Sequence, residues 1–154
     1  MSRPSPIPAA SLPTAAFRGA VRIRFGDCDP AGIVFFPAFF AMANGMIEDW
    51  FGDSLGIDFH ALHATRRIGT GFVHAEADFF TPGMMGDRIA LTPIVTRIGG
   101  GSYALAVHIH RDDDELARLH LVTATTDLDA RRAVRIPDDL RAALVAYQER
   151  CAHG

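Results

Sequence analysis

Alternating apolar and polar positions mark the start of the ordered part of the chain. Val21, Ile23 and Phe25 alternate with arginines, and this spacing of two predicts a half-buried β-strand over residues 17–26. The next segment, 26–32, combines glycines, a proline and two carboxylates, which is typical of a loop. The sequence therefore predicts a strand that leads directly into a polar loop.

After this loop the apolar spacing changes to three and four residues, which predicts a long helix. Pro37 suits a first helical turn, and Gly52 is the expected end of the helix. The apolar positions are Phe39, Phe40, Ala43, Met46, Ile47, Trp50 and Phe51. Because they cover more than one narrow stripe, we expect a sheet to wrap this helix. A shorter helical turn is expected over residues 59–65.

The rest of the chain is predicted to be mainly strands. In Val73–Phe79 one face is apolar and the other is polar. Further strands are expected over residues 87–98, 102–111 and 116–129, followed by a short amphipathic helix over residues 138–150. The turns between these strands are short, which favours antiparallel neighbours. The element order predicts an α+β fold in which an antiparallel sheet of about five strands wraps a long central helix.

Length and composition point to a single domain. A chain of 154 residues with 49% hydrophobic content can form one core. Residues 1–16 contain four prolines and three serines but no unbroken apolar run, so we expect a flexible N-terminal tail rather than a signal peptide or a membrane span. The domain is predicted over residues 17–150.

Charge and cysteine content exclude several classes of function. A formal net charge of -3 gives no reason to expect nucleic acid or a membrane surface as a partner. All fifteen basic residues are arginines, so lysine-based covalent catalysis is excluded. Cys28 and Cys151 lie far apart, which argues against a disulfide framework and favours a cytoplasmic location.

Two segments carry a resemblance to a known family. Residues 24–37, which read RFGDCDPAGIVFFP, closely resemble the active-site loop and helix start of the 4-hydroxybenzoyl-CoA thioesterase family. Residues 78–87 resemble the second hairpin of that family, and the element order agrees from about Phe17 to Tyr147. The resemblance implies a hotdog fold and acyl-CoA thioesterase activity. It also implies homodimers, which in this family often pair into homotetramers, with active sites at the subunit interface.

The resemblance also assigns roles to individual residues. It places the catalytic carboxylate on Asp29, a helix-start amide on Phe36, and a glycine of the loop facing the site on Gly69. Thioester hydrolysis needs a nucleophile or an activated water together with donors for the oxyanion. A helix that begins near Phe36 offers unpaired N–H groups for that purpose. The sequence leaves open whether Asp29 attacks the thioester itself or activates water.

Other residues of the loop have simpler interpretations. From spacing alone, Asp27 and Asp29 both suit hydrogen bonds to loop amides, and only the surrounding motif favours catalysis for Asp29. Asp27 is interpreted as structural. Cys28 has no histidine nearby in the sequence, so a small packed residue is favoured over a nucleophile.

The sequence predicts no metal site and no serine triad. His108 and His110 share one strand face, but nothing in the sequence identifies further ligands, and hydrogen-bonded histidines are the simpler interpretation. The same holds for His60 and His63. None of the serines lies in a G-x-S-x-G elbow, and the glycine run at 99–101 is interpreted as a hairpin turn rather than a phosphate loop.

The predicted function is hydrolysis of an aromatic or medium-sized acyl-CoA, with the CoA thioester as substrate and no cofactor. Some relatives of the family bind the CoA phosphates through a basic run near the turn where this chain has only Arg97. Other candidates are Arg66, Arg67, Arg88, Arg131 and Arg132, and no spacing distinguishes among them. The alternatives are an acyl-carrier-protein thioesterase and a non-catalytic acyl-CoA-binding protein of the same fold.

Overall fold

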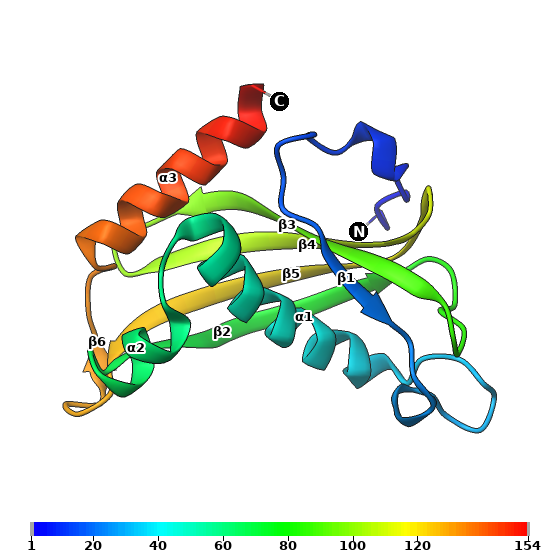
Figure 1. Ribbon diagram of the computed structural model, residues 1–154, viewed down its shortest axis with the longest axis horizontal. Helices are drawn as coiled ribbons and strands as arrows, with labels where there is room; N and C mark the ends of the chain where they lie inside the picture. Colours follow the sequence, from blue (N-terminus) through cyan, green and yellow to red (C-terminus); the bar gives the residue numbers. More distant parts are fainter. Residues whose placement is uncertain (1, 154) are drawn as a thin grey trace.

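The fold is a curled antiparallel sheet around a long helix, seen here in a computed structural model that describes residues 2–153 (Figure 1). The strands occur in the spatial order β1-β3-β4-β5-β2, and β6 pairs with β5. Their bounds are β1 Gly19–Arg22, β2 Ile68–Phe79, β3 Arg88–Ile98, β4 Ser102–Arg111, β5 Asp114–Asp127 and β6 Arg132–Ala133. The helices are η1 Ala9–Ser11, η2 Phe25–Asp27, α1 Phe36–Trp50, η3 Phe51–Leu55, α2 Phe59–Ala64 and α3 Asp138–His153. Among residues 2–153, no helix is long and apolar enough to span a membrane.

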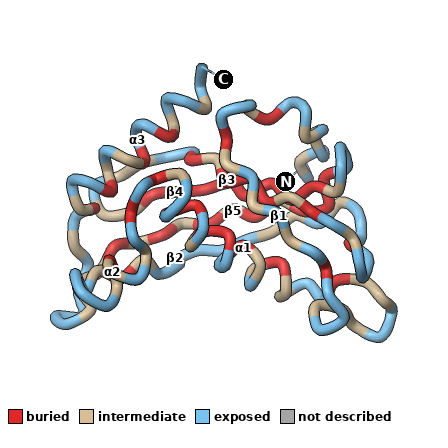
Figure 2. The backbone as a smooth tube through the Cα atoms, in the orientation of Figure 1, coloured by how far each residue is buried: buried red, intermediate tan, exposed pale blue. Residues whose placement is uncertain are grey.

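The core lies between α1 and the concave face of the sheet (Figures 1 and 2). The apolar face of α1 buries Phe39, Ala43, Met46, Ile47 and Trp50. The helix α3 closes one end of this core through Tyr147, whose ring centroid lies 5.2 Å from that of Trp50. The hydroxyl of Tyr147 donates to Pro93 O (2.7 Å) and accepts from Phe17 N–H (2.9 Å). The predicted α+β arrangement is therefore confirmed.

Several predicted boundaries differ from the structure. The first strand is only four residues long, because the backbone turns into η2 and Asp27 Oδ2 accepts from Arg24 N–H (2.8 Å). The long helix does not end at Gly52. It continues as a π-helical turn that buries Phe51 and Leu55 and ends at Gly56, where φ is 70°.

Strand β2 begins at Ile68, five residues before the predicted start at Val73. Gly69 and Gly71 interrupt the sequence alternation, but pairing with β5 extends the strand across them. The expected apolar face of β2 is also not covered within one chain. Val73 is 67% exposed and Phe79 is 39% exposed, because β2 is an edge of the sheet.

The predicted N-terminal tail, residues 1–16, lies against the sheet where it is described; Met1 is outside the described residues. We call residues 5–12 the N-terminal strap. Glu115 Oε2 accepts from Ile7 N–H (2.8 Å), and the carbonyl of Ile7 lies 2.9 Å from His110 Nε2. His110 alternates along β4 with buried core residues, so the strap covers the outer face of the sheet. The flexibility of the tail stays a prediction.

A buried polar network anchors the strap. The carboxylate of Glu115, whose side chain is fully buried, lies 2.9 Å from His108 Nδ1. It also accepts from Arg118 Nε (2.9 Å) and Nη2 (2.7 Å). Burial lowers the pKa of His108 despite the opposing effect of Glu115, and Arg118 and His110 lower it further. The pKa of Glu115 is also lowered, because the hydrogen bonds from Arg118, Ile7 and His108 outweigh burial.

These shifts predict that stability falls in two stages on acidification. Below the ordinary histidine pKa of 6.5, the unfolded chain binds a proton at His108 before the folded chain does, so unfolding is favoured. The contribution of Glu115 is fully present above its ordinary pKa of 4.5 and is lost as the pH falls through its lower folded value. Chemical denaturation from about pH 8 down to about pH 2 checks both stages. In the His108→Gln variant the upper stage should be reduced while the lower stage stays.

Candidate active site

The loop between β1 and α1 is held by backbone hydrogen bonds at both ends. Phe35 N–H donates to Asp27 O (2.8 Å), and Asp29 N–H donates to Ile33 O (3.0 Å). Gly32 N–H returns to Asp29 O (2.9 Å), a turn that places Gly32 at a φ of 81°. The loop is therefore a closed turn that presents Asp29 on a fixed backbone.

Asp29 itself is half-buried within this loop. Its Oδ1 accepts from Ala31 N–H (2.8 Å), the contact of an Asx-turn. The second oxygen of the carboxylate has no hydrogen-bond partner among residues 2–153. The carboxylate is therefore oriented by one amide and keeps one oxygen available for chemistry.

The start of α1 supplies a backbone donor beside the loop. Phe36 is the first residue of the helix, Pro37 has no N–H, and Ala38 N–H is used by Phe35 O (2.8 Å). Among residues 2–153, Phe36 N–H has no backbone acceptor. This amide lies at the positive end of the helix dipole, so it is suited to a developing oxyanion.

An apolar cavity of about 310 Å³ opens at this helix start. It is lined by Ile33, Val34, Phe36, Phe39 and residues 79–83. The ring of Phe79 lies 6.4 Å from that of Phe36, edge to face, and 6.1 Å from that of Phe39. Asp29 does not line the cavity, but Ile33, its backbone partner, does. The cavity can hold an apolar acyl group against a free helix-start amide.

The hairpin 79–87 forms the opposite wall, and sequence reasoning assigned none of its residues to the site. Val34 N–H donates to Gly83 O (2.9 Å), and Ile33 forms an isolated bridge with Met84. A side chain at Gly83 would meet Ile23 Cδ1 at 2.8 Å and Val34 Cγ2 at 3.1 Å, so glycine lets the hairpin approach this closely without moving its neighbours. The sequence signal that could have identified this wall is the adjacent Phe79-Phe80 pair beside a Pro-Gly turn.

The other loop residues make simple contacts, and Cys28 is partly rather than fully buried. Asp27 Oδ2 accepts from Arg24 N–H, a contact that fits a structural role in the turn. Desolvation raises the pKa of the Cys28 thiol, and Asp27 and Asp29 raise it further, so the thiol stays protonated near neutral pH. Cys28 is thus a poor nucleophile.

Within one chain, Gly69 does not lie at the site formed by Asp29 and Phe36. It lies near the start of β2, while Phe79 at the site ends the same strand; ten strand residues span roughly 33 Å. A side chain at Gly69 would meet Thr126 Oγ1 at 2.5 Å and Leu128 Cδ2 at 2.7 Å. Packing within the chain is therefore sufficient to explain this glycine.

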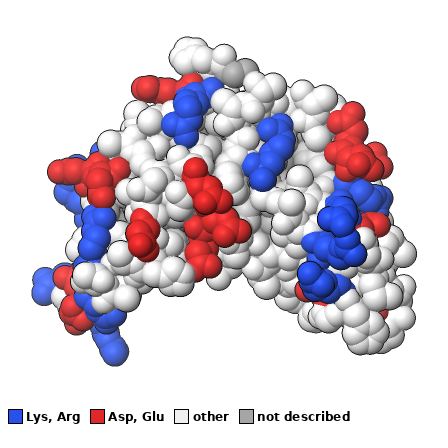
Figure 3. All heavy atoms as spheres, in the orientation of Figure 1, with Lys and Arg blue, Asp and Glu red and all other residues white. Residues whose placement is uncertain are grey.

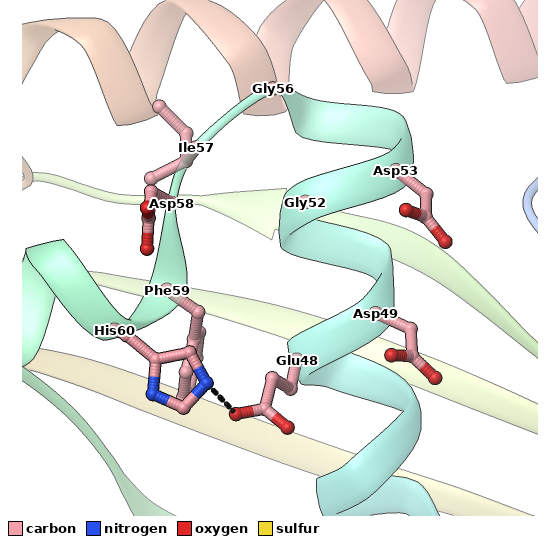
Figure 4. Close-up of a pocket in the computed structure, with 9 residues that line it drawn as sticks. All are labelled: Glu48, Asp49, Gly52, Asp53, Gly56, Ile57, Asp58, Phe59 and His60. Carbon is pink, nitrogen blue, oxygen red and sulfur yellow. Dashed lines mark ion pairs between the residues drawn. The ribbon is translucent and has the colours of Figure 1, made fainter.

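A larger hollow of about 490 Å³ lies at the other end of α1 (Figure 4). It contains Glu48, Asp49, Asp53 and Asp58, and Glu48 Oε1 lies 2.9 Å from His60 Nε2. Figure 4 shows Asp49 and Asp53 directed away from Asp58. Four carboxylates repel an anionic thioester, and residues 2–153 contain no group of three or more side chains arranged to hold a metal. This hollow does not suit the predicted reaction.

The sequence profile of the thioesterase-like superfamily matches residues 23–144, which include both walls of the apolar cavity. The chain belongs to the thioesterase-like superfamily. A 1,4-dihydroxy-2-naphthoyl-CoA hydrolase from Prochlorococcus marinus is 27% identical over 129 residues, which cover 77% of this chain and 80% of that protein. The predicted enzyme class, a thioester hydrolase, is confirmed at this level. Membership of the narrower 4-hydroxybenzoyl-CoA thioesterase family stays a prediction.

Solved structures agree with the fold. A thioesterase-superfamily protein from Jannaschia has a TM-score of 0.81 and 26% identity, covering 95% of this chain and 97% of its own. A 1,4-dihydroxy-2-naphthoyl-CoA thioesterase from Synechocystis has a TM-score of 0.77 and 23% identity, and the match covers 84% of this chain and 96% of that chain. The hotdog fold expected from the resemblance is therefore confirmed.

Proposed function

We propose that this thioesterase hydrolyses an aromatic acyl-CoA to the free acid and CoA. Asp29 is the catalytic carboxylate, and Phe36 N–H stabilises the oxyanion. The observation that carries the proposal is the backbone N–H of Phe36, which has no backbone acceptor and belongs to a residue that lines the apolar cavity beside the Asp29 loop. The naphthoyl-CoA hydrolase activity named for the Prochlorococcus relative supports an aromatic acyl group.

We assign each group a role in the reaction. The acyl ring lies among Phe36, Phe39 and Phe79, and the thioester carbonyl accepts from Phe36 N–H. Either Asp29 attacks the carbonyl carbon to form an anhydride that water then cleaves, or it removes a proton from an attacking water. In both routes the C–S bond breaks and CoA leaves as its thiolate. Phe36 and Phe79 are exposed within one chain. A bound acyl group or a second chain that covers them would exclude bulk water and strengthen the amide–oxyanion contact.

Release of free thiol from a panel of acyl-CoAs tests the proposal. Benzoyl-, hydroxybenzoyl- and naphthoyl-CoA should be cleaved with a higher kcat/KM than short or long aliphatic thioesters. A preference for long aliphatic chains would contradict the aromatic assignment. Tight binding of the whole panel without thiol release would instead identify a non-catalytic acyl-CoA-binding protein.

We also propose that the active form is a homodimer, able to pair further into a homotetramer, and built on the β2 edge. This edge is twelve residues long, and residues 71–76 are all exposed within one chain. Long exposed edges with apolar side chains favour pairing with another strand. Antiparallel pairing of two β2 strands about their midpoint brings Gly69 of one chain opposite Asp78 of the other. Gly69 would then approach the cavity of the second chain, as the resemblance implies.

Replacing Val73 with glutamate tests this dimer. A carboxylate on each edge strand near the two-fold axis would oppose strand pairing, so the variant is expected to sediment as a monomer and to lose most of its activity. Analytical ultracentrifugation and thiol release measure the two effects. Arg135→Glu, on an exposed residue away from the edge, is the matched control and should change neither. A fully active monomer would show that one chain forms the whole site.

A further inference from the structure

The arginines of this chain separate into those with partners and those without. Ion pairs with carboxylates hold Arg66, Arg67, Arg111 and Arg118. Others bond neutral oxygens or lie over an aromatic ring, namely Arg3, Arg18, Arg97, Arg141 and Arg150. Among residues 2–153, the remaining guanidinium groups have neither an ion pair nor a hydrogen bond. They form two separate groups: Arg22, Arg24 and Arg88 near the catalytic loop, and Arg131, Arg132 and Arg135 near β6.

The first group, which we call the arginine triad, lies around one hollow. Arg22 and Arg88 are direct cross-strand partners of β1 and β3, so their side chains leave the sheet on the same face. Together with Arg24, Ala20 and Val21 they line a hollow of about 440 Å³. All three arginines are exposed, and Figure 3 shows basic side chains gathered on the right-hand part of the molecule.

This pairing is unfavourable without an anion. Like charges directly opposite each other on neighbouring strands destabilise the pair, and no carboxylate of residues 2–153 forms an ion pair with the triad. The chain as a whole is acidic, with a formal net charge of -3, so the triad is a local positive site. Guanidinium groups bind phosphate oxygens in bidentate geometry, so the triad suits a ligand with several phosphate oxygens.

We propose that the arginine triad binds the phosphate groups of the CoA nucleotide. The inference rests on the proposed function and specifies how that substrate is held. Arg24 precedes Asp29 by five residues, so their Cα atoms lie at most about 18 Å apart. The pantetheine arm of CoA separates the thioester from the phosphates, so a phosphate site at this distance from the carboxylate fits one extended substrate. The hairpin turn after β3 offers only Arg97, which lies 3.4 Å from Ser102 Oγ.

Two substrates with the same acyl group test the triad. Benzoyl-CoA carries the phosphates, and benzoyl-pantetheine lacks them. In a triple variant, Arg22→Gln, Arg24→Gln and Arg88→Gln, KM for benzoyl-CoA should rise at least tenfold while kcat changes little. The kinetic constants for benzoyl-pantetheine should stay within about twofold of wild type. The affinity for adenosine 3′,5′-bisphosphate, measured by calorimetry without any turnover, should fall in parallel.

A charge-matched comparison variant carries Arg131→Gln, Arg132→Gln and Arg135→Gln, and should bind the bisphosphate as wild type does. The proposal is overturned if this variant, rather than the triad variant, loses benzoyl-CoA affinity. It is also overturned if both variants lose it equally, or if the triad variant is impaired equally on benzoyl-pantetheine. If the wild-type protein cleaves neither substrate, the proposed function is wrong. Bisphosphate binding by the wild type and by the triad variant then still tests whether the triad is a phosphate site.

Discussion

Replacing Asp29 with asparagine is expected to lower kcat about 1000-fold, the scale of a lost general base or nucleophile. Asparagine has the same size, and its side-chain oxygen can still accept from Ala31 N–H, so the Asx-turn should survive. What the amide cannot do is attack a carbonyl as an anion or accept a proton from water. Thiol release with a saturating aromatic acyl-CoA measures the loss, and an unchanged Tm shows that the loop has kept its structure.

The neighbouring carboxylate provides the control for this experiment. Asp27→Asn weakens one hydrogen bond to Arg24 N–H and should cost about 1 kcal/mol of stability, with kcat within a few-fold of wild type. If Asp27→Asn abolishes activity, or if Asp29→Asn retains more than a tenth of it, the assignment of the catalytic carboxylate is wrong. Because the two residues are two positions apart in one loop, general damage to the loop would affect both.

Isotope labelling of Asp29 tests whether this residue attacks the thioester directly or activates a water molecule. Many turnovers in H₂¹⁸O, followed by mass spectrometry of the peptide that contains Asp29, would show whether its carboxylate acquires the label. Label there arises only if Asp29 first forms an anhydride and water then attacks the aspartyl carbonyl. The Asp27→Asn protein serves as the reference, since it retains Asp29.

The sequence predicted the parts of the fold that local chemistry determines. The start of α1 near Phe36 follows from Pro37 and from the change in apolar spacing, and both signals lie within a few residues. The end of the same helix was predicted wrongly at Gly52. Its continuation depends on the burial of Phe51 and Leu55 against distant elements, and no local signal reports that burial. The start of β2 at Ile68 likewise depends on its pairing with β5.

In the candidate site, too, the sequence could predict the parts that lie on one local segment but not those that depend on long-range contacts. Asp29 and Phe36 lie on one short segment, so a local motif was sufficient to nominate both. The far wall at Gly83 comes from a hairpin about fifty residues later, and its approach depends on a backbone contact with Val34. The arginine triad combines Arg22 with Arg88, which become neighbours only through strand pairing. A single sequence contains no direct record of such register.

The second large effect is expected at Glu115, in the buried polar network on the outer face of the sheet. Replacing it with alanine should lower the free energy of unfolding by about 3–5 kcal/mol, because its removal leaves Arg118 and His108 without their carboxylate in a buried place. For a chain of this length the Tm should fall by roughly 10 °C. Thermal and chemical denaturation measure the change. Glu149→Ala, on an exposed position of α3, is the matched control and should stay within about 0.5 kcal/mol of wild type.

Coupling between Glu115 and the N-terminal strap makes this prediction specific. Deletion of residues 2–12 removes Ile7, whose N–H donates to Glu115 and whose carbonyl contacts His110. If Glu115 anchors the strap, the Glu115→Ala substitution should cost less in the shortened chain than in the full chain, by about 0.5–3 kcal/mol. Strictly additive losses would show that the strap and the carboxylate stabilise the sheet independently. A measurable coupling would explain how a segment without apolar periodicity is held, because its contacts with Glu115 and His110 are made by backbone groups that leave no pattern in the sequence.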